Sequence, residues 1–237
     1  MRYGTTETSQ EIEARKPRFA VVPVGSFEQH GAHLPVTTDT LIAAGIADAL
    51  CRDHGGLLLP PVAVTCSHEH AGFAGTASIS ATTLLAVLSD MLVSLEHAGI
   101  DLMVLVNGHG GNYVLSNFAQ EANVERPRVY LAPVRQQWQA AMDAGGIESG
   151  ISEDMHGGEL ETSLMLHMYP ELVRPKHLRK DHDAPDRPLL TLHGMRHYTT
   201  SGIVGFPSRA TAEKGAAVLT HLVASIAGEV EKIQSRR

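Results

Sequence analysis

The stretch that decides the fold is residues 21–39, VVPVGSFEQHGAHLPVTTD. It starts as an apolar, β-branched run, which predicts a buried strand, and it breaks into an irregular polar segment. That segment carries Glu28 and His30, and Asp39 follows nine residues after His30. Side chains at positions i and i+2 of an extended segment point to the same side, so Glu28 and His30 can converge. Carboxylate and imidazole ligands favour zinc, manganese or iron over calcium or magnesium. The alternative is a polar loop in which both side chains only face water.

Apolar runs and helical patterns alternate along the rest of the chain. We predict strands at residues 19–24, 57–64, 101–106 and 128–134. The run DLMVLV at 101–106 is typical of a central parallel strand that is covered on both faces. The pair Pro60-Pro61 restricts the second strand to an edge or an irregular position. Helical patterns lie at residues 39–50, 80–99, 113–124, 160–168 and 211–233. This order predicts an α/β fold, a three-layer α/β/α sandwich with a mostly parallel central sheet.

Two further segments are expected to be irregular. Residues 135–154 have one predicted helical turn around Trp138 and a Gly/Ser-rich remainder, which is typical of a segment that covers a site. Residues 174–200 are rich in Arg, His, Asp and Pro and are predicted to be a surface loop. Residues 1–18 are polar and predict a short helix or a loosely docked arm.

The amino-acid composition limits the classes of protein to which this chain can belong. The 237 residues, 43% hydrophobic and 19% charged, are typical of one soluble globular domain spanning 1–237. The net charge of −7 argues against nucleic-acid binding, which usually needs a basic face. Cys51 and Cys66 are too few for a disulfide framework. We expect a cytoplasmic protein without membrane contact, because there is no apolar leader region and no run of 18 apolar residues.

A second polar motif follows another predicted strand. His109 lies in NGHGGN, residues 107–112, just past the carboxyl end of the run at 101–106. In open α/β sheets this end forms the ligand crevice, and the glycines leave room for a metal or a substrate. We therefore expect Glu28 and His109 to lie in the same crevice. The alternative is a tight turn with an incidental histidine.

Four segments together resemble the signature blocks of the creatininase family of metal-dependent amidohydrolases. They are VGSFEQHGAHLPVTTD, SHEHAGFAGTAS, NGHGGN and HGGELETSLMLHMYPELV, at residues 24–39, 67–78, 107–112 and 156–173. They occur in the family's order, so the resemblance extends over nearly the whole chain. It implies two divalent ions, Zn, Mn or Fe, in one site. By position, Glu28 and His109 would bind one ion, His30 would bind the other, and Asp39 would bridge both.

The chain departs from the family pattern at one ligand. Creatinine-hydrolysing members carry a glutamate two residues after the histidine of NGH, and this chain has Gly111 there. Glu159 falls where those members have an apolar residue, and our hypothesis is that it replaces the lost carboxylate. Glu161, which matches the family residue of the ETS motif, lies about 200° around the helix from Glu159, so both cannot face one ion squarely. Which of the two completes the second metal site stays open.

His156 matches a family histidine that lies beside the substrate, and with Glu161 we assign it to the catalytic groups. A histidine with a near-neutral pKa can move a proton from the activated water to the leaving nitrogen. The alternative is a residue at a helix N-terminus that only bonds to backbone. The remaining charged or imidazole groups of the first two blocks are predicted to surround the ligands or the substrate rim: His33, His68, Glu69 and His70.

The resemblance implies that a hydroxide shared by the two ions attacks an amide carbonyl, since a metal lowers the pKa of water from about 15.7 toward about 7. Creatinine itself is not the first choice of substrate, because residues 145–155, GGIESGISEDM, contain no aromatic side chain to cover it. Members that are similar at NGHGGN include a formamide hydrolase and a peptidase for a redox-cofactor precursor. We expect a small-molecule or short-peptide amide and a homo-oligomer, with a hexamer favoured. A non-catalytic metal-binding subunit and a phosphoesterase are the alternatives.

Overall fold

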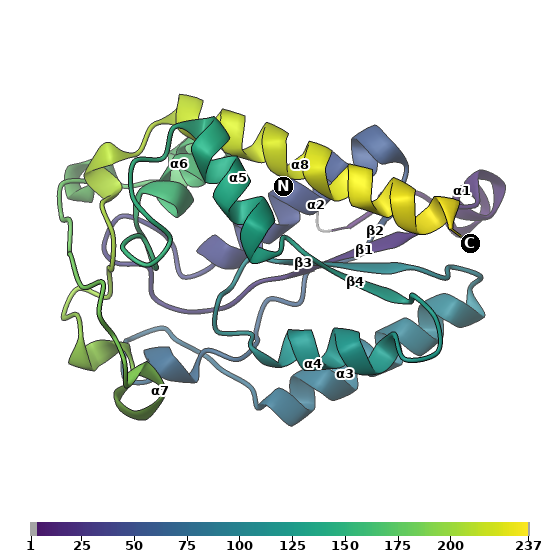
Figure 1. Ribbon diagram of the computed structural model, residues 1–237, viewed down its shortest axis with the longest axis horizontal. Coiled ribbons are helices and arrows are strands. Elements are labelled where there is room, and N and C mark those ends of the chain that lie inside the picture. Colours follow the sequence, from purple (N-terminus) through teal and green to yellow (C-terminus); the bar gives the residue numbers. More distant parts are fainter. Residues whose placement is uncertain (1–3, 237) are drawn as a thin grey trace.

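The structure, a computed structural model, describes residues 4–236. Its sheet has four parallel strands in the order β2-β1-β3-β4 (Figure 1). They are β1 (Ala20–Val24), β2 (Leu57–Leu58), β3 (Met103–Asn107) and β4 (Val129–Ala132). The two central strands pair along the whole of β1, from Ala20 opposite Met103 to Val24 opposite Asn107. Both central strands therefore end at the same edge, and the segments that follow them leave the sheet side by side.

Helices cover both faces of this sheet (Figure 1). One face carries α2 (Thr38–His54), α5 (Arg135–Gly145), α6 (Glu159–Met168) and α8 (Ala212–Ser235). The other face carries α3 (Ala81–His97) and α4 (Val114–Ala122). Alternate residues of each strand point to opposite faces of the sheet. Val21 and Val104 pack in the core under α2 and α8, the first core, whereas Val22 and Leu105 pack in the core under α3 and α4, the second core. The predicted three-layer α/β/α sandwich is confirmed.

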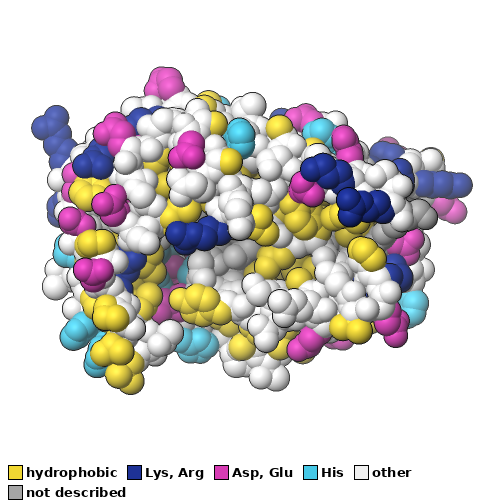
Figure 2. Space-filling view, in the orientation of Figure 1, with side chains coloured by type: hydrophobic (Ala, Val, Ile, Leu, Met, Phe, Trp, Pro, Cys, Tyr) yellow, Lys and Arg dark blue, Asp and Glu magenta, His cyan; other side chains and the backbone are white. Residues whose placement is uncertain are grey.

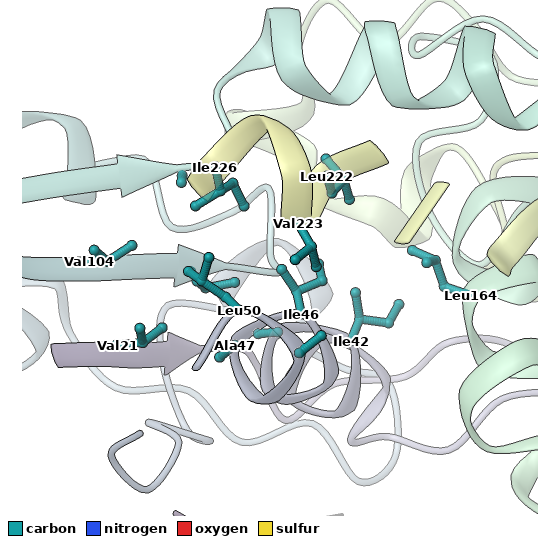
Figure 3. Packing of buried hydrophobic residues seen from close by; sticks show 14 of the residues in the cluster. Val21, Ile42, Ile46, Ala47, Leu50, Val104, Leu164, Leu222, Val223 and Ile226 are labelled. Carbon is teal, nitrogen blue, oxygen red and sulfur yellow. The ribbon is translucent and has the colours of Figure 1, made fainter. Parts of the chain in front are cut away.

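The helix α2 lies at the centre of the first core. Its residues Ile42, Ile46 and Leu50 are spaced four apart, so they share one helix face, and all three are buried in the cluster that also contains Val21, Val104 and Leu164 (Figure 3). Burying a side chain of this size contributes roughly 1.5–3 kcal/mol. The long helix α8 closes this core from outside with Leu222, Val223 and Ile226 (Figure 3). The packing fixes the first turn of α2 beyond the carboxyl end of β1.

Two predicted elements differ from the structure. The strand expected at 57–64 is only Leu57–Leu58, because Pro60 and Pro61 lack the N–H that would continue the ladder; beyond them Val62 forms a single bridge to Val24. The single helical turn expected near Trp138 is the eleven-residue helix α5. Its residues are mostly good helix formers such as Ala, Gln and Arg, and it packs along α8 with Ala141 buried in the first core.

The remaining elements are short. The helix α1 (Ser9–Arg15) lies in the predicted N-terminal arm, whose first three residues fall outside the described part of the chain. The segment expected to be a loop between α6 and α8 gathers beyond one end of the sheet and contains single turns (Figure 1). The short helices of the chain are η1 (His68–His70), η2 (Pro170–Leu172), η3 (Pro175–His177), α7 (Leu190–His193), η4 (Met195–His197) and η5 (Pro207–Arg209).

Across residues 4–236, none of the helices combines the length and the apolar character that crossing a bilayer requires.

Candidate metal centre

The four residues singled out at the ends of the predicted strands meet beyond the carboxyl edge of the sheet. Glu28 and His30 lie in the irregular segment after β1, Asp39 lies in the first turn of α2, and His109 follows β3. Each is at most 5% exposed. In the described part of the chain, no Lys or Arg forms an ion pair with these two carboxylates. Among the described side chains, only imidazoles are therefore placed to balance the negative charge of Glu28 and Asp39.

Asp39 joins the two histidines of this group. Its Oδ1 lies 2.8 Å from His30 Nε2, and its Oδ2 lies 2.9 Å from His109 Nδ1. The hydroxyl of Ser26 donates a hydrogen bond to the same Oδ2 at 2.8 Å, which holds the carboxylate in place. Glu28 Oε1 lies 3.3 Å from His109 Nδ1. Asp39 thus has one oxygen directed to each side of the cluster.

The outward nitrogens of the two histidines bond to backbone carbonyls. His30 Nδ1 donates to the carbonyl oxygen of Glu28 at 3.1 Å, and His109 Nε2 donates to that of Cys66 at 2.9 Å. Because a carbonyl can only accept, these bonds place the ring protons on the outward nitrogens and leave His30 Nε2 and His109 Nδ1 for the cluster. This is the arrangement that metal-ligating histidines adopt in proteins.

Gln29 gives two more histidines opposite tautomers. His156 Nε2 donates to the backbone oxygen of Gln29 at 2.6 Å, so its unprotonated Nδ1 lies toward the cluster, 3.8 Å from Glu28 Oε1. The amide orientation of Gln29 is set because its Oε1 accepts from the Gly31 N–H at 2.9 Å. Its Nε2 therefore donates to His70 Nδ1 at 3.0 Å, and the protonated His70 Nε2 lies 3.2 Å from Glu28 Oε1 without the alignment of a hydrogen bond.

The two glutamates of α6 have different surroundings. Glu161 Oε2 lies 3.9 Å from His30 Nε2 and accepts from the Gly157 N–H at 2.6 Å, so this carboxylate borders the cluster. Glu159 is fully buried elsewhere: Lys214 Nζ lies 2.6 Å from it, and the Ser149 hydroxyl donates to it at 2.8 Å. The hypothesis that Glu159 replaces the lost carboxylate is therefore corrected, because the rotation of α6 turns its side chain away from the cluster.

Several overlapping groups of these side chains have the spacing of metal ligands, with ligand atoms within 4.8 Å of one another. Two groups share Asp39 and lie on its two sides. Two further groups share Glu28. One adds His156, which the sequence predicted as a catalytic group, and the other adds Glu69 and His70 of the block SHEH, which the sequence placed only around the ligands. The groups are Glu28–Asp39–His109, His30–Asp39–Glu161, Glu28–His30–His156 and Glu28–Glu69–His70.

Burial and charge together make this cluster favour a positive charge at its centre. Burial raises the pKa of Glu28 to about 7 and that of Glu161 to about 8. Burial opposes the charged form of His30, but the neighbouring Asp39 outweighs it and raises the pKa of His30 to about 10. Both carboxylate oxygens of Glu28 are buried without a hydrogen-bond partner. Orphaned carboxylate oxygens facing imidazole nitrogens fit a site for divalent cations.

Burial has the opposite effect on two other histidines. It lowers the pKa of His70 to about 3 and, with the charge of His30 nearby, holds the pKa of His156 well below its usual range. Both rings are therefore neutral around pH 7. A neutral His156 with an unprotonated Nδ1 is able to accept a proton at the centre of the cluster.

The loop around His109 forms walls of two cavities. One, of about 460 Å³, is bordered by His109 and Glu161 and otherwise by mostly apolar side chains, including Trp138, Met142 and Leu160. Figure 2 shows this face of the molecule hollowed between α5 and α4, with basic side chains at the rim. The second cavity, of about 550 Å³, lies beside Gly111 and is bordered by η1 and α7. One cavity thus reaches His109 and Glu161 of the cluster, and the other reaches Glu69.

Known proteins share this sequence pattern. Residues 5–230 match the family model described as "Creatininase: Creatinine amidohydrolase". A mycofactocin precursor peptide peptidase from Mycobacterium ulcerans is 36% identical over 92% of this chain and 86% of its own length. A creatinine amidohydrolase from Pseudomonas putida is 27% identical over 95% of this chain and 94% of its own length.

Solved creatininases share the fold. A mutant creatininase of the Zn-Zn type superposes with a TM-score of 0.81 at 26% identity, over 96% of both chains. A manganese form of creatininase superposes equally well, with a TM-score of 0.81 at 25% identity over 96% of both chains. The family model, the peptidase relative and the shared fold agree, so this chain belongs to the creatininase family of hydrolases that act on carbon–nitrogen bonds.

Proposed function

We propose that this chain is a dinuclear metal-dependent amidohydrolase that cleaves a C–N amide bond in a short peptide. The observation that carries the proposal is the position of Asp39, which is common to two potential ligand groups and directs one oxygen to each. Glu28 and His109 would complete one site, and His30 and Glu161 would complete the other. Solved creatininases of Zn-Zn and Mn types support zinc or manganese as the ions.

When bound, such a pair of ions would polarise the amide carbonyl as a Lewis acid and lower the pKa of the attacking water. The protein residues then have separate tasks. Ser26 and Gly157 hold Asp39 and Glu161 by hydrogen bonds, so the carboxylates keep their directions as charge develops. Buried surroundings exclude water and strengthen these electrostatic interactions.

Two histidines have proposed roles, one in proton transfer and one in balancing charge. His156 presents an unprotonated Nδ1 to the centre, where it would accept a proton and pass it to the leaving nitrogen. His70 presents a protonated Nε2 to Glu28 Oε1, where it would offset the negative charge of that carboxylate. The single side chain of Gln29, together with its backbone oxygen, fixes both roles.

A peptide substrate agrees with the cavities and with the relatives. The peptidase relative is more similar to this chain than the creatinine amidohydrolase, at 36% against 27% identity. Cavities on both sides of the His109 loop suit a substrate that extends past the cluster in two directions. Creatinine fits less well, because residues 145–155 contain no aromatic side chain to cover a small ring.

The test uses purified protein that has been stripped of metal and reloaded with zinc or manganese. Metal content is measured, and the protein is incubated with mycofactocin precursor peptide, with unrelated short peptides and with creatinine, followed by mass spectrometry of the products. We expect two ions per chain and cleavage of one amide bond in the precursor peptide. Ions without turnover of any amide would indicate a non-catalytic metal-binding protein, and turnover of creatinine alone would replace the peptide assignment.

We also propose a closed homo-oligomer, with a hexamer favoured, and a cytoplasmic location. Light scattering on the eluting peak of a gel-filtration column measures the oligomeric mass, and a monomer would exclude the first of these.

A further inference from the structure

The space beside Gly111 is filled by a side chain from another part of the chain. A Cβ atom placed on Gly111 would lie 1.8 Å from Glu69 Oε1 and 2.4 Å from His109 Nε2. The neighbouring Gly110 differs, since a Cβ atom there would meet nothing within 4 Å. A side chain at position 111 would therefore have to displace the Glu69 carboxylate or the His109 ring, which occupy that volume.

Glu69 reaches this position from the short helix η1. Its carboxylate is only 14% exposed, and Oε1 lies 3.5 Å from His109 Nε2, the nitrogen that also donates to the backbone oxygen of Cys66. The carboxylate lies behind the imidazole, on the side away from Asp39, whose Oδ2 lies 2.9 Å from the opposite ring nitrogen.

We propose that Glu69 is a positioning residue for His109, with Gly111 keeping the space open for it. This inference rests on the proposed function, in which His109 Nδ1 binds a metal ion. A carboxylate behind a ligating imidazole fixes the ring proton on the outward nitrogen, orients the ring and makes the inward nitrogen a stronger ligand. The Cys66 carbonyl does this weakly as a neutral group, and Glu69 adds a full negative charge.

Direct metal binding by Glu69 is the competing role, since it has ligand spacing with Glu28 and His70. The tautomer of His70 opposes it. Gln29 donates to His70 Nδ1, so the His70 nitrogen that faces Glu28 carries a proton and has no lone pair for an ion. Glu69 therefore acts through His109 rather than on an ion.

The test compares Glu69→Gln and Gly111→Ala with Gly110→Ala as the matched control. Metal affinity is measured by competition with a chromogenic chelator, together with the number of ions per chain and the Tm of the metal-free protein. Loss of an outer partner of a metal ligand typically costs about 10–100-fold in metal affinity. We expect this loss for Glu69→Gln, with two ions still bound at saturation and the metal-free Tm unchanged. Gly111→Ala should displace the carboxylate and weaken binding at least as much, and Gly110→Ala should bind metal like the wild type.

Three outcomes would overturn the inference. Wild-type affinity in Glu69→Gln would show that His109 does not depend on Glu69, even if Gly111→Ala binds weakly through a direct clash with the ring. Loss of one whole ion in Glu69→Gln would make Glu69 a ligand. A wild-type protein that binds no metal would overturn the proposed function itself, and this inference with it, whereas the first two outcomes leave the proposed function intact.

Discussion

Two buried carboxylate clusters lie at opposite sides of the helix α6, and they are built in different ways. Around Glu159, the backbone N–H groups of Glu148 and Ser149, the Ser149 hydroxyl and the Lys214 ammonium all donate to one carboxylate. Around Asp39, the carboxylates face imidazole rings, no Lys or Arg of the described residues forms an ion pair with them, and Glu28 has no hydrogen bond to either oxygen.

The difference shows that burial of a glutamate does not identify a metal ligand. Glu159 and Glu28 are both fully buried, but the charge of the first is already neutralised by Lys214 and its lone pairs are occupied. A buried carboxylate without partners is costly, and such a group persists when another cation balances it. The partners of a side chain therefore discriminate the structural carboxylate from the candidate ligand.

Asp39→Asn should have the largest effect, because it removes the negative charge common to both ligand groups. We expect fewer than one ion per chain and a fall in kcat/KM of about 10³-fold or more, equivalent to about 4 kcal/mol of transition-state stabilisation. Elemental analysis and steady-state kinetics check this. Ser26→Ala, which removes only the hydroxyl donor to Asp39, is the milder control. Two ions and full turnover in Asp39→Asn would remove the basis for a dinuclear centre.

His156→Gln should lower kcat by about 10²–10⁴-fold, the usual range for a general acid–base group, without changing metal content. The reason is that its Nδ1 is the unprotonated nitrogen that faces the cluster. Kinetics and metal analysis on the same sample separate the possible roles. Loss of an ion would instead make His156 a ligand, as its spacing with Glu28 and His30 allows.

Glu161→Gln and Glu159→Gln form a matched pair on one helix. We expect Glu161→Gln to reduce the metal content to one ion, because its carboxylate borders His30. Glu159→Gln should keep both ions but leave Lys214 without its buried partner, which costs about 1–3 kcal/mol and lowers Tm by about 2–12 °C. Calorimetry with metal analysis checks both. The reverse pattern would restore Glu159 as the ligand.

The smallest effect concerns the pH dependence of the metal-free protein. The pKa of Glu161 is about 8 in the folded state against 4.5 in a free chain, so between these values the folded state holds a proton that the unfolded state releases. The stabilisation is complete below pH 4.5 and is lost as pH rises through 8. We expect the Tm of chelator-treated protein to fall by a few degrees between pH 6 and 9, and to fall less in Glu161→Gln. Equal slopes in the two proteins would contradict the raised pKa.

Sequence patterns were reliable where the environment is uniform along an element. The central strands β1 and β3 are covered on both faces, so their continuous apolar runs predicted them directly. The helix α5 was predicted as a single turn although its residues are good helix formers, because its few apolar side chains give a weak helical pattern until they pack against α8. The length of the edge strand β2 was overestimated, although Pro60 and Pro61 already indicated that the strand ends early.

The sequence alone determined that Glu28, His30, Asp39 and His109 meet, because each lies within a few residues of the end of a central strand or the start of α2, and parallel strands bring those ends to one edge. Only the tertiary structure decided the remaining partners. Glu161 rather than Glu159 borders the cluster because packing sets the rotation of α6, and Lys214, fifty-five residues further on, neutralises Glu159. Glu69 fills the space at Gly111 for the same kind of reason, since a short turn distant in sequence is folded over the loop of β3.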